Sequence, residues 1–116
     1  MLDLPTPDQL RLCARFGVTP FPTPGDQKVG IARNVREGIW PVHGLRHPPE
    51  GGTCGWYLWA GDDIPEDPDF FLPLHAHHLH EWRPEIVVYL ALPPGWRFRV
   101  APGYEDVYED DTLLVL

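Results

Sequence analysis

Four histidines, His75, His77, His78 and His80, fall close together and are the first residues that could carry chemistry. Imidazole nitrogens bind Zn²⁺ and related metals, but a firm site needs three or four ligands that converge. We expect segment 74–82 to be a short helix, on which only residues three or four apart are neighbours. The histidines then form two pairs that point in different directions, and no H-E-x-x-H pattern is present. We therefore predict no bound metal. A metal-dependent enzyme that uses His75, His78 and nearby acids is the less favoured alternative.

Carboxylates gather in two segments of the second half of the chain, and in the later segment they are interleaved with tyrosines. The first segment, 62–69, lacks the ligand order of a calcium-binding loop, and two prolines stiffen it. It is either a solvated loop or a preorganised anionic surface, and a stiff loop loses less entropy when it binds a partner. Aromatic rings with a charged rim are typical of the energetic centre of an interface. The sequence therefore predicts a partner-binding surface made of Asp62, Asp63, Glu66, Asp67, Tyr104, Glu105, Asp106 and Tyr108.

Nucleophilic catalysis has little support in the sequence. There is no serine, and the two cysteines, Cys13 and Cys54, are expected to be buried and inert thiols. Acids are plentiful, but no pattern selects a catalytic pair, and neither a phosphate-binding loop nor a dinucleotide fingerprint occurs. We predict no catalytic residues and no cofactor, so that the protein is not an enzyme.

The charge of the chain is uneven. The formal net charge is −8, and residues 61–116 hold three basic and twelve acidic residues, which gives −9 for that part. Nucleic acid binding requires clustered Lys and Arg, so this composition argues against it. An acidic surface attracts basic protein partners and speeds their encounter, although acidity also serves solubility alone.

Length and composition predict a soluble single domain, 1–116, in a reducing compartment. The 116 residues are the size of one ordinary domain, and 15 prolines with 11 glycines divide them into short elements. Two cysteines cannot build a disulfide framework, and we expect no signal peptide and no membrane span. A cytoplasmic location follows as the simplest expectation, and the oligomeric state stays open.

The hydrophobic patterns predict an α+β fold, with a small antiparallel sheet of about four to six short strands and about three short helices packed on it. Strict alternation in 96–101 predicts a half-exposed strand, and apolar residues on both faces of 54–60 predict a central strand. Pro41 would place the strand at 39–45 at an edge or a bulge. Further strands are expected at 27–35, within 103–111 and at 112–116, and helices at 6–16, 74–82 and 84–91.

The first helix, 6–16, carries its own start signal. Thr6 suits the N-cap, and Gln9 completes a capping box three residues later. The helical spacing of Leu10 and Cys13 predicts that both side chains belong to the core.

One strand of the sequence has a distinctive pattern, a glycine–tryptophan pair followed by an aromatic residue, a small residue, a glycine and acids. These residues are Gly55, Trp56, Trp59, Ala60, Gly61, Asp62 and Asp63. The pattern lies within three segments, VREGIWPVHGLRHPPEGGTCGWYLWAGDD (35–63), DPDFFLPLHAHHLHEWRPEIVVYLALPPGWRF (67–98) and APGYEDVYED (101–110). In these segments the chain resembles the bacterial immunity protein 33 family and its 33-like relatives, and the resemblance covers about residues 28–110.

The resemblance implies a cognate inhibitor of a polymorphic secreted toxin, made in the cytoplasm of the producing cell. Such an inhibitor would bind the toxin and block it without catalysis, and a nuclease toxin with a basic cleft would fit the acidic charge. The alternative is a cytoplasmic interaction or regulatory domain that has no toxin partner.

Overall fold

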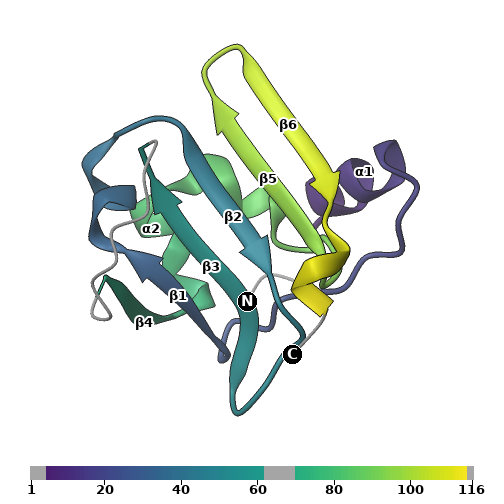
Figure 1. Ribbon diagram of the computed structural model, residues 1–116, viewed down its shortest axis with the longest axis horizontal. Helices are drawn as coiled ribbons and strands as arrows, with labels where there is room; N and C mark the ends of the chain where they lie inside the picture. The colour runs from purple at the N-terminus through teal and green to yellow at the C-terminus, as the bar shows by residue number, and fades with distance from the viewer. Residues whose placement is uncertain (1–4, 62–69, 115–116) are drawn as a thin grey trace.

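The computed structural model describes residues 5–61 and 70–114, which form one six-stranded sheet with helices packed on it (Figure 1). The chain follows an α+β plan, as predicted. The strands are β1 (Lys28–Ala32), β2 (Val42–Arg46), β3 (Thr53–Ala60), β4 (Phe71–His75), β5 (Trp96–Ala101) and β6 (Tyr104–Glu109). The helices are α1 (Pro7–Arg15) and α2 (Leu79–Trp82), with 3₁₀ helices η1 (Arg33–Glu37), η2 (Ala76–His78), η3 (Pro84–Tyr89) and η4 (Asp111–Leu114).

The strand order in the sheet is β4-β1-β3-β2-β5-β6. Every neighbouring pair is antiparallel except β1 and β3, which run parallel because β2 crosses to the far side of β3. The sheet is therefore mixed, where the sequence predicted a small antiparallel one, and the α+β class holds. β3 is central, as predicted, and β5 occupies the predicted residues 96–101.

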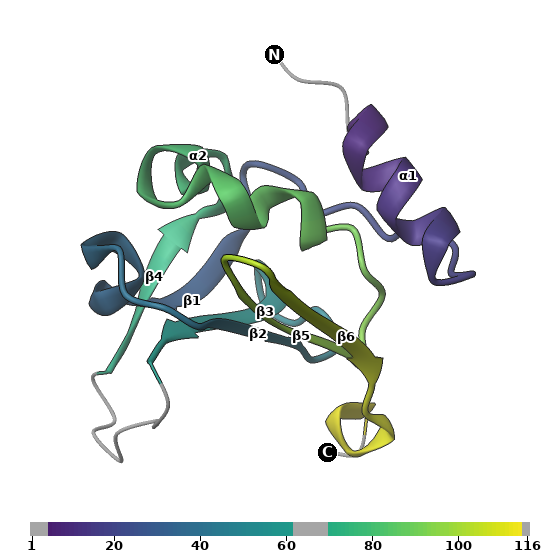
Figure 2. The ribbon, with the colours of Figure 1, turned by 90° about the horizontal axis from the view of Figure 1, so that it is seen from above.

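One face of the sheet is covered by helices. Seen from above, α1, α2 and the η3 segment all lie on the same side of the strands (Figure 2). The side chains between these two layers form the core, with Ile31, Val42, Trp56, Leu58, Leu79, Ile86, Leu92 and Phe98 among its buried members. The opposite face, turned towards the viewer in Figure 1, carries none of these three helices; we call it the open face.

Helix α1 begins as predicted but buries a different side. Thr6 accepts a hydrogen bond from the Gln9 backbone N–H, and the Gln9 side chain accepts one from Thr6, which completes the capping box. The prediction for Leu10 was wrong, because its side chain is 47% exposed. Gln9, Leu12 and Cys13 are buried instead, and the Gln9 amide donates to the Val87 carbonyl oxygen on η3 at 2.9 Å. This polar contact moves the buried stripe away from Leu10.

Two strand predictions are corrected by the structure. Strand β2 lies between β3 and β5, so Pro41 does not place it at an edge; the proline precedes the strand and leaves its ladder intact. The predicted strand at 112–116 is not formed in its described part, because Asp111–Leu114 is the 3₁₀ helix η4. None of the helices in the described residues is long and apolar enough to cross a membrane.

Candidate functional site

The β5–β6 hairpin holds the described part of the predicted binding surface. Pro102 and Gly103 form its two-residue turn, and Gly103 has a φ of 74°, as a type II turn requires at its third position. The turn fixes the register, so that Ala101 pairs with Tyr104. Side chains of β6 therefore alternate between the two faces of the sheet.

Tyr104, Asp106 and Tyr108 lie on the open face of β6. Their neighbours in register on β5 include Arg99 and Arg97, whereas Phe98 and Val100 point into the core. The guanidinium of Arg97 lies 5.8 Å from the centre of the Tyr108 ring, and that of Arg99 lies 5.8 Å from the Tyr104 ring. The tyrosines remain 48% and 39% exposed at positions 104 and 108. The two arginines thus support two solvent-facing rings.

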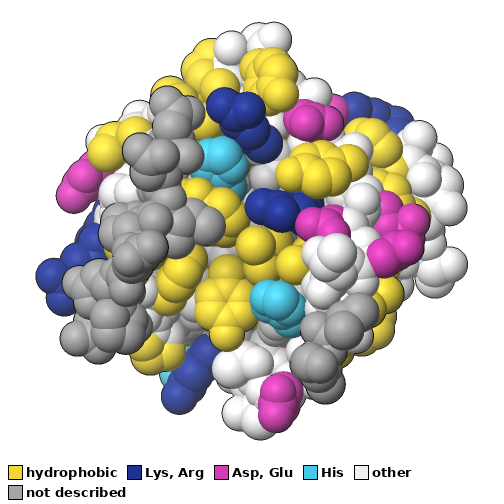
Figure 3. Space-filling view, in the orientation of Figure 1, with side chains coloured by type: hydrophobic (Ala, Val, Ile, Leu, Met, Phe, Trp, Pro, Cys, Tyr) yellow, Lys and Arg dark blue, Asp and Glu magenta, His cyan; other side chains and the backbone are white. Residues whose placement is uncertain are grey.

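The same face continues as an aromatic surface across the sheet. The rings of His43 and Trp59 stack with centroids 4.9 Å apart, and Tyr57 meets Phe71 edge to face at 5.4 Å. Trp59 is almost fully covered by such neighbours, while Tyr57 stays exposed. Hydrophobic side chains (yellow) cover much of this face in Figure 3, with Lys or Arg (dark blue) and His (cyan) side chains between them. The rings are fixed by mutual packing, so the surface is preorganised.

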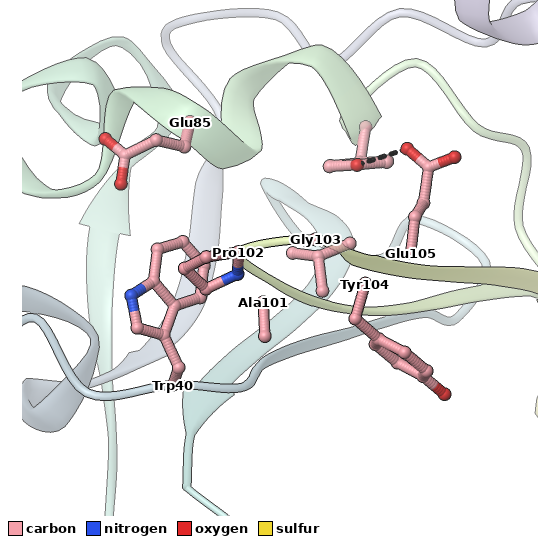
Figure 4. A pocket seen from close by; sticks show the side chains of 9 residues that line it. Trp40, Glu85, Ala101, Pro102, Gly103, Tyr104 and Glu105 are labelled. Carbon is pink, nitrogen blue, oxygen red and sulfur yellow. Dashed lines mark hydrogen bonds between the residues drawn. The ribbon is translucent and has the colours of Figure 1, made fainter.

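Glu105 lies on the helix-covered face and borders a pocket of about 610 Å³ between η3 and the hairpin (Figure 4). Its carboxylate accepts a hydrogen bond of 2.6 Å from the Tyr89 hydroxyl, drawn as the dashed line in Figure 4, and pairs with Arg15 of α1. Partial burial opposes ionisation of Glu105, but hydrogen bonds from Tyr89 and Arg15 more than offset it, so the pKa is lowered. Burial, with the neighbouring carboxylate, raises the pKa of Tyr89. Trp40 and Pro102 supply apolar walls.

We expect Tyr89→Phe to lower the free energy of unfolding by about 1–2 kcal/mol at pH 7, because it removes a hydrogen bond to an ionised group. A depressed carboxyl pKa stabilises the fold above the unfolded pKa, and this stabilisation is lost as pH falls through the folded value. The difference between variant and wild type should therefore shrink as pH falls below about 4. Urea unfolding of both proteins at pH 7 and pH 3.5 measures this difference in the free energy of unfolding. An unchanged difference at the two pH values would contradict the ionised hydrogen bond.

The predicted binding residues are divided by the structure. Asp62, Asp63, Glu66 and Asp67 lie outside the described residues. Tyr104, Asp106 and Tyr108 share the open face, and Glu105 lies on the other side of β6. The described acids therefore do not form one continuous face, because neighbours along a strand point in opposite directions. Sequence reasoning also missed that Arg97 and Arg99 stand beside the tyrosines. The Pro102-Gly103 turn was the signal that could have set this register.

The histidine-rich segment is not one helix, which corrects the prediction for 74–82. His75 ends β4, His77 and His78 belong to η2, and His80 belongs to α2. His77 bonds the Gly25 carbonyl oxygen at 2.7 Å through Nδ1, and the His78 ring meets Glu81 at 3.0 Å. Within residues 5–61 and 70–114, no group of three or more His, Cys, Asp or Glu side chains is placed to hold a metal ion.

Both cysteines are buried and unbridged. Burial raises the pKa of the Cys13 thiol and of the Cys54 thiol. Cys54 donates weakly to the Lys28 carbonyl oxygen, so this side chain packs inside the sheet–helix core rather than in a cleft. A thiol with a raised pKa is mostly protonated at neutral pH and is a poor nucleophile.

The fold and surface define a small α+β domain with a helical layer on one side of a mixed sheet and an aromatic, arginine-bearing face on the other. The chain belongs to the Imm33-like domain family, whose model matches residues 8–110. The resemblance drawn from the glycine–tryptophan strand is thereby confirmed, and the chain carries an immunity-type domain. No curated protein and no solved structure matches it.

Proposed function

We propose that this protein is an immunity protein that neutralises a cognate bacterial toxin by binding it, without catalysing a reaction. Membership of the Imm33-like family supports an immunity role. The observation that carries direct binding is the pair of exposed rings, Tyr104 and Tyr108, each backed by an arginine on the neighbouring strand. Cytoplasmic action in the producing cell is part of the proposal.

Tyrosines in this setting are suited to anchor a partner. Tyr side chains have few rotatable bonds, and the arginines beneath these two restrict them further, so little side-chain entropy is lost on binding. Exposed Tyr and Arg are the residue types that dominate interface energetics. The open face therefore provides a rigid aromatic platform next to the β6 edge.

The charge of the chain favours a basic partner. With a net charge of −8, the protein produces a negative potential that speeds encounter with a basic surface and makes the rate fall with added salt. The hairpin 96–110 itself carries two arginines and four acids, a net −2. A toxin whose active cleft is lined by Lys and Arg fits this balance.

The test is co-expression with the toxin encoded beside the gene, followed by calorimetric titration of the purified pair. We expect Tyr104→Ala and Tyr108→Ala each to weaken binding by about 2 kcal/mol, close to thirtyfold in Kd, as for hot-spot rings. Leu10→Ala is the matched control, since Leu10 is 47% exposed on α1 and Tyr104 is 48% exposed. Survival of the host without any physical complex would refute neutralisation by binding. Tyrosine variants that bind like wild type would move the interface elsewhere.

A further inference from the structure

The two edges of the sheet differ in how they are protected. At one edge, β4 contains Pro73 at its centre, and proline lacks the N–H that an added strand would use. At the other edge, β6 runs for six residues, YEDVYE, without proline, lysine or glycine. Natural proteins usually block such an edge, so β6, which carries acidic side chains and the ion pair of Glu105 with Arg15 of α1, is the less protected of the two edges.

The direction of the β6 backbone groups follows from the hairpin register. Asp110 donates its backbone N–H to the Gly95 carbonyl oxygen at 2.6 Å, which makes this pair a hydrogen-bonded one. Hydrogen-bonded and non-hydrogen-bonded pairs alternate along an antiparallel ladder, so Tyr104, Asp106 and Tyr108 bond to β5. The other three residues of β6 are Glu105, Val107 and Glu109. Their backbone N–H and C=O groups therefore point away from β5, toward the open edge of the sheet.

These outward groups have no backbone partner among residues 5–61 and 70–114. Glu109 is exposed, and the Val107 side chain is partly buried against the core. The Glu105 side chain is 31% exposed beside its bonds to Tyr89 and Arg15. An extended segment that pairs with Glu105, Val107 and Glu109 would become a seventh strand. Every second side chain of that strand would then lie beside Tyr104, Asp106 and Tyr108 on the open face, and the others would lie beside Glu105, Val107 and Glu109 on the helix-covered side.

Charge decides which segment can occupy this edge. A second copy could pair its own β6 antiparallel to this one through the same three outward residues. In each such register one acid falls opposite another: Glu105 with Glu105 or Glu109, Asp106 with Asp106 or Asp110, or Glu109 with Glu109. Like charges directly opposite are destabilising, whereas opposite charges stabilise a pair of strands. A basic strand from another protein meets no such repulsion.

We propose that β6 binds an extended, lysine- or arginine-bearing segment of a partner protein by adding it as a strand to this edge. The basic residues belong opposite Glu105 and Glu109, four positions apart, with an apolar residue between them opposite Val107. This inference rests on the proposed function in one respect: the segment is assigned to the toxin.

The first measurement is amide hydrogen exchange of the full chain with and without the toxin. We expect protection to rise at Glu105, Val107 and Glu109, since Tyr104, Asp106 and Tyr108 already bond to β5. A complex in which those three amides exchange as before overturns strand addition and leaves the immunity role standing. Protection that grows with protein concentration alone indicates self-pairing and also overturns it.

A second measurement separates this inference from the proposed function. The probe is a synthetic nonapeptide of threonine and valine with two lysines four positions apart, and its counterpart has glutamates in their place. Protection of the same amides by the lysine peptide only, in the absence of any toxin complex, supports the edge site and refutes the toxin assignment. If neither toxin nor lysine peptide protects them, strand addition is overturned, and the immunity role fails as well only when the toxin forms no complex with the chain.

Val107→Pro provides the matched mutational test. It removes an outward N–H, which β5 does not use, and should weaken binding by at least about tenfold. Val107→Ala removes the same side-chain packing but keeps the N–H, and should bind within about twofold of wild type. Equal loss in both variants would assign the effect to packing and overturn strand addition. Should Val107→Pro fail to fold, the exchange measurements on the wild-type chain decide the question.

Discussion

Arg46→Met is expected to lower the free energy of unfolding by about 3–5 kcal/mol, because it removes a fully buried cation on which several carbonyl groups depend. Arg46 is 0% exposed and lies in β2, on the helix-covered side of the sheet. Its guanidinium contacts no carboxylate in any ion pair among the described residues. It donates instead to the backbone oxygens of Phe21, Pro22, Cys54, Leu90 and Leu92.

In the Arg46→Met variant these carbonyl oxygens lose the donor that the guanidinium provides. The Leu90 oxygen keeps bonds from Trp56 and Thr23 in the variant, but the Phe21 and Leu92 oxygens accept no other hydrogen bond within the described part of the chain. A buried acceptor without a donor costs about 1–3 kcal/mol. The rings of Phe21 and Trp56 flank the guanidinium at 4.8 and 5.6 Å, so cation–π contacts are lost as well.

Arg46→Lys is the matched variant. Burial lowers the pKa of Arg46 to about 10, so the group still carries its charge at neutral pH. Lysine also carries the charge but has three donors on one atom, which cannot reach carbonyls on several sides. We expect Arg46→Lys to lower the free energy of unfolding by about 2 kcal/mol, so that its stability lies between those of wild type and Arg46→Met. Urea unfolding followed by circular dichroism gives all three values. A methionine variant as stable as wild type would show that the carbonyls find other donors.

Arg46 also marks a limit of sequence reasoning. In VHGLR, an arginine at a strand end is expected to be exposed, because charged side chains are rarely buried without a partner. Its partners here are loop carbonyls at 21–22 and 90–92, which only the tertiary fold brings together. Gln9 is a similar case, since its amide is buried by a bond to Val87, 78 positions away. Local patterns carry no information about such contacts.

Elements with a complete local signal were predictable. The capping box at Thr6 and Gln9 and the alternation of 96–101 each specify their own structure within a few residues. The parallel pairing of β1 with β3 was not predictable from local sequence, because it depends on the side of β3 on which β2 pairs. For the candidate site, Tyr104 and Tyr108 were proposed from the acidic residues that surround them in the sequence. The contacts of Arg97 and Arg99 with these two rings could not be predicted without the register of the β5–β6 hairpin.

The second large effect is expected at Gly55, the glycine of the pattern that carries the family resemblance. Gly55 has a φ of +93°, and a Cβ built on it would lie 1.8 Å from the backbone oxygen of His47. The same two residues are joined by a hydrogen bond of 2.9 Å from the His47 N–H to the Gly55 oxygen, which holds the end of β2 against β3. Gly55→Ala must therefore adopt an unfavourable φ and also push the two strands apart. We expect the free energy of unfolding to fall by about 3–5 kcal/mol.

Gly52→Ala separates the two contributions to that loss. Gly52 has a φ of +86°, but a Cβ there meets nothing within 4 Å, so the variant suffers the backbone strain without the clash. A loss of about 1–2 kcal/mol is expected for it in urea unfolding. The difference between the variants then measures the approach of His47 to β3. If both variants lose the same free energy of unfolding, the positive φ alone explains why a glycine is needed at position 55. The contact between His47 and β3 would then relax to admit the Cβ. A larger loss at Gly55 means that the end of β2 approaches β3 so closely at His47 that only glycine fits there.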